Sequence, residues 1–98
     1  MITIDPAQRE LRALERVTRW HGRRVLEVGC GDGRLTMRLA RLGAATIRAF
    51  DPAAKVVRAA RAALPSRYHG RVDYRVGRAE RLPYRAHEFD CVVFAWAL

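Results

Sequence analysis

Three glycines on alternate positions, Gly29, Gly31 and Gly33, form the part of this sequence best suited to chemistry. An apolar stretch at residues 25–28 precedes them, and the polarity pattern changes from strand-like to helix-like at Arg34. Glycine suits the turn between them because it accepts positive φ and lets a ligand approach the backbone closely. The following helix directs free N–H groups at that ligand. The pattern predicts a site for a nucleotide-like ligand.

The spacing of the glycines differs from the dinucleotide fingerprint G-x-G-x-x-G, because Arg34 takes the place of its third glycine. A plain strand-to-helix turn is the alternative interpretation. Asp51 favours a ligand, since it stands about 20 positions after Gly31 at the end of the next expected strand. A carboxylate there can accept hydrogen bonds from both hydroxyls of a ribose. Its other possible role is to cap the helix that begins at Pro52, and it can do both.

Alternating strands and helices must position these residues. We predict strands at residues 24–28, 46–50, 72–76 and 89–96, of which the first and the last are apolar nearly throughout, as expected of parallel strands covered on both faces. Helical periodicity predicts helices at residues 6–22, 33–41 and 52–64. Residues 77–88 are predicted to form a loop or a short helical turn. The alternation indicates parallel strands joined by right-handed crossovers, and we expect Trp20 to belong to the core.

Composition limits the class of protein. The 98 residues fit one domain, and their longest apolar run, residues 91–98, is too short to span a membrane. The net charge of +9 is the balance of 19 basic and 10 acidic residues. The basic residues are 18 arginines and one lysine spread along the chain, so we expect a solvated surface rather than a nucleic-acid site. Cys30 and Cys91 are expected to be reduced thiols without a metal, and the location to be cytoplasmic, with no targeting segment.

Four stretches together resemble a class I S-adenosylmethionine-dependent methyltransferase of the ubiquinone/menaquinone-biosynthesis-like type. They are VLEVGCGDG at residues 25–33, Phe50 with Asp51, GRAERLPY at residues 77–84, and FDCVV at residues 89–93. They match in order and spacing over about residues 22–98. The resemblance implies a Rossmann-like three-layer α/β/α fold with a parallel sheet of order 3-2-1-4. Within the single domain of residues 1–98, an N-terminal helix at residues 6–22 precedes the cofactor-binding half at residues 23–98.

The resemblance also implies the cofactor, S-adenosyl-L-methionine, and the residues that bind it. These residues are Glu27, Gly29, Cys30, Gly31, Gly33, Asp51, Pro52, Ala79, Glu80 and Ala95. Glu27 and the loop backbone are implied to hold the amino-acid part, because a carboxylate can pair with an ammonium group. Asp51 is implied to take the ribose hydroxyls, with Pro52, Ala79 and Glu80 near the adenine. Ala95 and Trp96 are implied to lie beside the methionine chain.

Two departures from the family pattern affect these expectations. Arg78 stands where many relatives have an acidic residue that accepts from the adenine amino group, so adenine recognition is expected to use backbone groups or Glu80. The chain also stops at Leu98, directly after the fourth strand, whereas the resemblance implies three further strands that supply most substrate-binding groups. We therefore expect a truncated domain whose fourth strand, from Phe89 to Trp96, lies at an open edge.

An open apolar edge is a template for association, so we expect a homodimer or a C-terminal partner at the fourth strand. The expected ligands are S-adenosylmethionine and S-adenosylhomocysteine. As an enzyme, the protein is expected to transfer a methyl group to a small-molecule acceptor. The alternative is a catalytically incomplete cofactor-binding or assembly module. No residue is identified as a general base, because His21, His69 and His87 fall near loop ends, and we name no catalytic residue.

Overall fold

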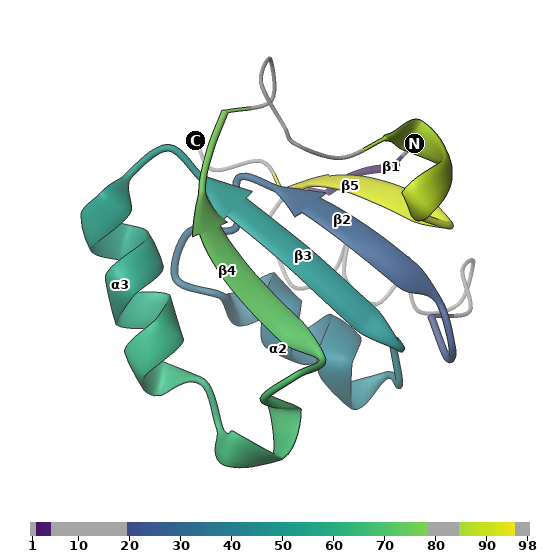
Figure 1. The fold of residues 1–98 in the computed structure, drawn as a ribbon, viewed down its shortest axis with the longest axis horizontal. Helices are drawn as coiled ribbons and strands as arrows, with labels where there is room; N and C mark the ends of the chain where they lie inside the picture. Colours follow the sequence, from purple (N-terminus) through teal and green to yellow (C-terminus); the bar gives the residue numbers. More distant parts are fainter. Residues whose placement is uncertain (1, 5–19, 79–84, 96–98) are drawn as a thin grey trace.

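A computed structural model of the protein describes residues 2–4, 20–78 and 85–95. Parallel strands form one sheet in the order β1-β5-β2-β3-β4 (Figure 1). The strands are β1 (Ile2–Ile4), β2 (Arg24–Val28), β3 (Thr46–Asp51), β4 (Val72–Val76) and β5 (Cys91–Ala95). The order β4-β3-β2-β5 is the predicted order 3-2-1-4, so the sequence-based topology is confirmed for these four strands.

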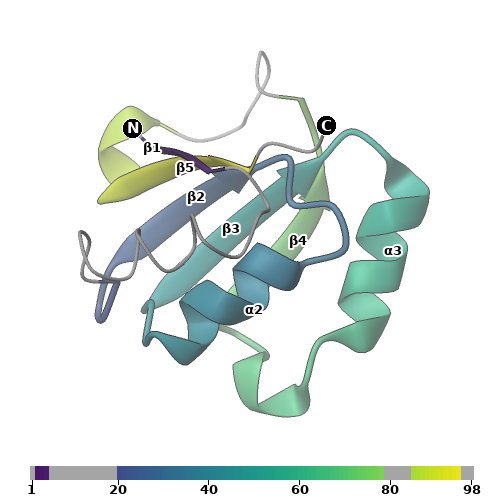
Figure 2. The ribbon, with the colours of Figure 1, turned by 180° about the vertical axis from the view of Figure 1, so that it is seen from behind.

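Helices α2 (Arg34–Arg41) and α3 (Ala54–Ala63) lie on the same face of the sheet, the face turned to the viewer in Figure 2. Two 3₁₀ turns, Ser66–Tyr68 and Ala86–Glu88, lie between the later elements. The described residues thus contain two of the three predicted layers. The predicted helix at residues 6–22 falls mostly outside the described part, although its Trp20 is buried as expected.

The core lies between the sheet and these two helices. Alternate strand residues point into it, including Val25, Ile47, Tyr74 and Val93, and they belong to one cluster of buried side chains with Leu39 of α2. Each fully buried aliphatic side chain of this kind contributes roughly 1.5–3 kcal/mol relative to exposure. This packing fixes the strands and therefore the loops at their carboxyl ends.

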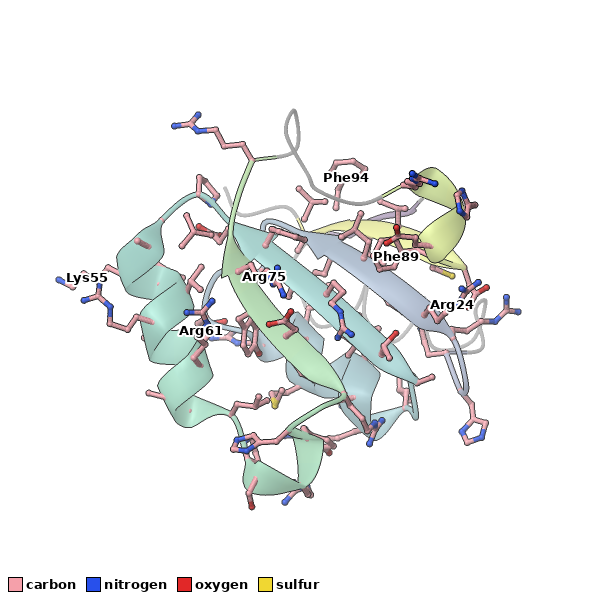
Figure 3. All side chains as sticks on the ribbon, viewed as in Figure 1. Arg24, Lys55, Arg61, Arg75, Phe89 and Phe94 are labelled. Atoms are coloured by element: carbon pink, nitrogen blue, oxygen red, sulfur yellow. The ribbon has the colours of Figure 1, made fainter. Side chains whose placement is uncertain are left out.

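A salt bridge holds the starts of β2 and β5 side by side. Arg24 Nη2 lies 3.2 Å from Asp90 Oδ1, and the Arg24 backbone N–H donates to Asp90 Oδ2 at 2.8 Å (Figure 3 labels Arg24). The Asp90 backbone N–H in turn donates to the Arg24 carbonyl at 2.8 Å. These contacts join β2 and β5 where both strands begin, at the end of the sheet opposite the glycine turn.

The expectation that the fourth predicted strand lies at an open edge is wrong, because β1 pairs with it. Ile2 stands opposite Val93 and Ile4 opposite Ala95 in a parallel ladder (Figure 1). The three residues of β1 carry β-branched side chains, which favour extended backbone. Periodicity could not identify so short a strand, because three residues show no repeat.

Within the described residues, no helix is long and apolar enough to cross a bilayer.

Candidate functional site

The glycine turn is hydrogen-bonded to the carboxyl end of β3. The backbone N–H groups of Gly29 and Cys30 both donate to the Phe50 carbonyl, at 2.7 and 2.8 Å. The carboxyl end of β4 lies beside that of β3, since the Gly77 N–H donates to the Asp51 carbonyl at 3.1 Å. In an open parallel α/β sheet, ligands bind in the crevice outside the carboxyl ends of the strands.

Asp51 connects the glycine turn to α3. Its Oδ2 accepts a hydrogen bond from the Gly31 N–H at 3.0 Å, and its Oδ1 accepts one from the Ala53 N–H at 2.9 Å. The hydrogen bond to Ala53 closes a turn just before α3, whose N-cap is Ala53 and carries no side-chain cap, so the helix-capping role considered for Asp51 is not seen. The contact with the loop at Gly31 is one that the sequence did not predict. Each carboxylate oxygen retains capacity for a further donor.

At two positions of the turn, close neighbours leave no room for a side chain larger than that of glycine. Gly29 has φ 82° and lies against the end of β5, because a Cβ built there falls 2.8 Å from the Ala95 carbonyl oxygen. Gly33 has φ 85°, and a Cβ built there overlaps the Tyr74 hydroxyl. By contrast, a Cβ built at Gly31 meets no atom of residues 2–4, 20–78 or 85–95 within 4 Å. The turn is packed at both ends and open in the middle.

Glu27 lies beneath this turn and is completely buried, with 0% exposure. Its Oε1 accepts a hydrogen bond from the Thr36 hydroxyl of α2 at 2.5 Å. Among the described residues, its Oε2 has no hydrogen-bond partner. Burial, partly offset by the Thr36 hydrogen bond, raises the pKa of Glu27 to about 8. The carboxyl group is therefore mostly neutral at pH 7.

Tyr74 completes the polar cluster under the turn, and sequence reasoning missed it. Its hydroxyl shares a hydrogen bond with the Thr36 hydroxyl, and burial raises the pKa of Tyr74 to about 12. The Arg61 Nε of α3 donates to the Tyr74 carbonyl at 2.8 Å, which ties α3 to β4 (Figure 3). Only the β3–β4 register and the position of α2 bring Tyr74 to Gly33, so no local pattern could reveal it.

The other residues expected at the site fall into three groups. Pro52 is exposed beside Asp51, and Ala95 lies against Gly29. Cys30 is buried in the core, where burial raises the pKa of its thiol to about 12, and its N–H is the group that donates to the Phe50 carbonyl. Both cysteines are free thiols, as expected. Three expected residues lie outside the described part of the chain: Ala79, Glu80 and Trp96.

A parallel α/β sheet with a glycine turn after a central strand, and an acidic residue at the end of the next strand, defines a Rossmann-like nucleotide-binding protein. The chain belongs to a family of methyltransferases: residues 25–98 match the family described as "Methyltransferase domain". S-adenosylmethionine is the cofactor that this family and fold imply. The described residues fit it, because Gly31 leaves space over the turn and Glu27 keeps one oxygen without a partner.

Similar proteins include two curated relatives, each named "Ubiquinone biosynthesis O-methyltransferase". The one from Xanthomonas axonopodis pv. citri (strain 306) is 48% identical over 73 residues, which cover 72% of this chain and 29% of the relative. The one from Chelativorans sp. (strain BNC1) is 36% identical over 74 residues, covering 76% of this chain and 28% of the relative. This chain thus spans less than a third of the length of the curated relatives it matches.

A solved structure of an S-adenosylmethionine-dependent methyltransferase from Mesorhizobium loti superposes with a TM-score of 0.79. The superposition covers 94% of this chain and 41% of that one, at 23% sequence identity. At this identity the similarity shows the fold alone.

Proposed function

We propose that this chain is the cofactor-binding half of an S-adenosylmethionine-dependent methyltransferase that methylates a small-molecule acceptor. The observation that carries the proposal is the link between Asp51 and Gly31, which brings a carboxylate with spare acceptor capacity to an open glycine turn. When bound, the cofactor supplies an electrophilic methyl group on a sulfonium. The residues of this chain bind and orient it.

The proposed contacts combine the roles implied by the family resemblance with the structure described around the turn. Asp51 accepts hydrogen bonds from the ribose hydroxyls, and the backbone of Gly29, Cys30, Gly31 and Gly33 faces the amino-acid part. Glu27 takes the ammonium group, since its Oε2 has no partner in the described structure. The remaining proposed contacts lie near the adenine and the methionine chain: Pro52, Ala79, Glu80 and Ala95.

Calorimetric titration with S-adenosylhomocysteine tests the proposal, with Asp51→Asn as the variant and Asp73→Asn as its control. Asp73 is a carboxylate on the neighbouring strand β4 whose Oδ2 pairs with Arg75 Nε at 2.8 Å, away from the turn. We expect Asp51→Asn to weaken binding about 10- to 100-fold, because hydrogen bonds to a charged acceptor contribute about 1.5–3 kcal/mol. Asp73→Asn is expected to bind like the parent. A folded parent chain that binds no cofactor contradicts the proposal.

A second candidate is a cofactor-binding module that acts only with a partner. The match covers 29% and 28% of the two curated relatives, so the residues that bind the acceptor are proposed to lie outside the matched stretch. Because β1 pairs with β5, such a partner would either pair a strand of its own with β1 or displace β1 from β5. Transfer of radiolabelled methyl groups to small hydroxyl compounds by the isolated chain would decide for the enzyme. The free thiols agree with a reducing compartment, and we propose the cytoplasm.

A further inference from the structure

Glu27 places a carboxyl group inside the apolar layer between the sheet and α2. The side chain has 0% exposure, and the Thr36 hydroxyl at Oε1 is the hydrogen-bond partner seen among the described residues, while Oε2 has none. An ionised carboxylate in this position carries a charge with little solvation, and such a charge costs several kcal/mol unless a cation balances it.

The groups that face Glu27 in the described part of the chain supply no such cation. Thr36 faces it from α2, Cys30 and Asp32 from the turn, and Tyr74 from β4. All four are neutral or acidic, and the charge of Asp32 adds to the rise in the pKa of Glu27 that burial causes. The ligand-free site therefore favours the protonated carboxyl group.

We propose that Glu27 is a neutral carboxylic acid in the ligand-free chain and that a ligand ammonium group at the glycine turn displaces its proton. The inference rests on the proposed function, which assigns Glu27 to the ammonium group. On binding, the Oε2–H bond of Glu27 breaks, the proton passes to solvent, and the carboxylate accepts a hydrogen bond from the ammonium. The ligand keeps its own charge, so each binding event near pH 7 releases about one proton.

Thr36 is a positioning residue in this exchange. Its hydroxyl holds Oε1, which leaves Oε2 as the oxygen available to the ligand. The same hydrogen bond lowers the pKa of Glu27 against the effect of burial. Thr36→Val, which keeps the shape of the side chain, is therefore expected to move the titration midpoint of Glu27 to higher pH. A merely structural role for Thr36 would leave that midpoint in place.

Carbon-13 NMR of side-chain carboxyl groups tests the ligand-free state directly. In a chain labelled at glutamate, the Glu27 signal is identified by its absence from Glu27→Gln, or from its response to Thr36→Val if Glu27→Gln does not fold. We expect this signal to remain that of the acid at pH 7 and to titrate at about pH 8. A midpoint near the ordinary glutamate value overturns the proposal.

Two ligands separate the effect of the ammonium group from that of the nucleoside. S-adenosylhomocysteine carries the ammonium, whereas 5′-methylthioadenosine has the same nucleoside and thioether without it. At pH 7 the first is expected to convert the Glu27 signal to that of a carboxylate, and the second to leave it unchanged. The affinity for S-adenosylhomocysteine is expected to rise about tenfold from pH 6 to pH 7 in the parent and to stay flat in Glu27→Gln.

The possible failures are distinguishable. Binding of S-adenosylhomocysteine without loss of the Glu27 proton overturns this inference and leaves the proposed function intact. Deprotonation by 5′-methylthioadenosine also overturns it, because the ammonium group would then not be the cause. A folded chain that binds neither ligand overturns the proposed function and this inference with it.

Discussion

Gly31 and Gly33 share a left-handed backbone, with φ 54° and 85°, yet their surroundings differ. A methyl group at Gly31 meets none of the residues that the structure describes, whereas one at Gly33 overlaps the Tyr74 hydroxyl. Both alanine variants carry the left-handed cost of about 1–2 kcal/mol. Gly33→Ala adds an overpacking cost of about 1–3 kcal/mol. The two glycines are thus separable by experiment.

We expect Gly33→Ala to lower the free energy of unfolding more than Gly31→Ala does, as measured by urea denaturation. Tyr74→Phe in the Gly33→Ala background is expected to restore part of the loss, because it removes the overlapping oxygen. Gly31→Ala is expected to stay folded and to weaken cofactor binding, since its methyl group occupies the open part of the turn. Equal loss of stability in the two single variants would contradict this assignment.

Glu27 gives the protein a pH dependence of defined sign. The folded chain binds the Glu27 proton more tightly than the unfolded chain, whose pKa is close to the ordinary 4.5, so the free energy of unfolding falls as pH rises from about 5 to about 8. The total change is on the order of 4 kcal/mol. Urea denaturation across this range is expected to show the slope in the parent and to lose most of it in Glu27→Gln. A parent whose stability is constant from pH 5 to pH 8 would contradict the burial argument.

The elements are held by interactions that cross between them, and the end of α2 is an example. Arg71, which precedes β4, donates from Nη2 to the carbonyls of Ala40 and Ala44, at 3.0 and 2.7 Å. These carbonyls lie at and just beyond the carboxyl end of the helix, where backbone acceptors lack intrahelical partners and a positive charge is favourable. Arg71 therefore fastens α2 to the start of β4.

Arg71→Met keeps the aliphatic part of the side chain and removes both hydrogen bonds. We expect it to lower the free energy of unfolding by about 1–3 kcal/mol, because two partly buried carbonyls lose a charged donor. Arg58→Met, at an exposed position on α3, is the control and is expected to change stability little. Thermal or urea unfolding followed by circular dichroism measures both variants. Similar losses in the two would show that arginine at position 71 has no special role.

The sequence predicted the strands and helices better than it predicted the contacts between them. β2 and β4 have the predicted bounds, and each strand ends at a valine that a glycine follows, Gly29 after β2 and Gly77 after β4. α3 begins at Ala54 rather than at Pro52, since Asp51 accepts from the Ala53 N–H and holds the first residues outside the helix. The contacts of Thr36 with Glu27 and of Tyr74 with Gly33 depend on how separate elements pack, which no local pattern records.

At the scale of the whole molecule, β1 covers the edge of β5 that the sequence led us to expect to be exposed. Parallel pairing with Ile2–Ile4 satisfies backbone groups of Val93–Ala95 that would otherwise be open to another chain. The protection needs backbone pairing alone, so it is sensitive to the presence of the strand rather than to any one side chain.

Deletion of residues 1–4 is therefore expected to make the protein self-associate. Size-exclusion chromatography with light scattering should show a mass that rises with concentration for the shortened chain. The full chain at the same concentrations is the control and is expected to keep a constant mass. A shortened chain that stays folded and monomeric would mean that β1 does not protect the edge.

The pairing of β1 with β5 also determines when the sheet can close during folding. Ile2 and Val93 are about ninety positions apart, so this ladder closes one of the longest loops in the chain. The entropic cost of closure grows with loop length, and ladders of high sequence separation form slowly. The pairs β2–β3 and β3–β4 join strands that are near in sequence and can form while a nascent chain is still emerging. β1 can dock only after residues 93–95 have been synthesised, so among the described strands the first in sequence is the last to join the sheet.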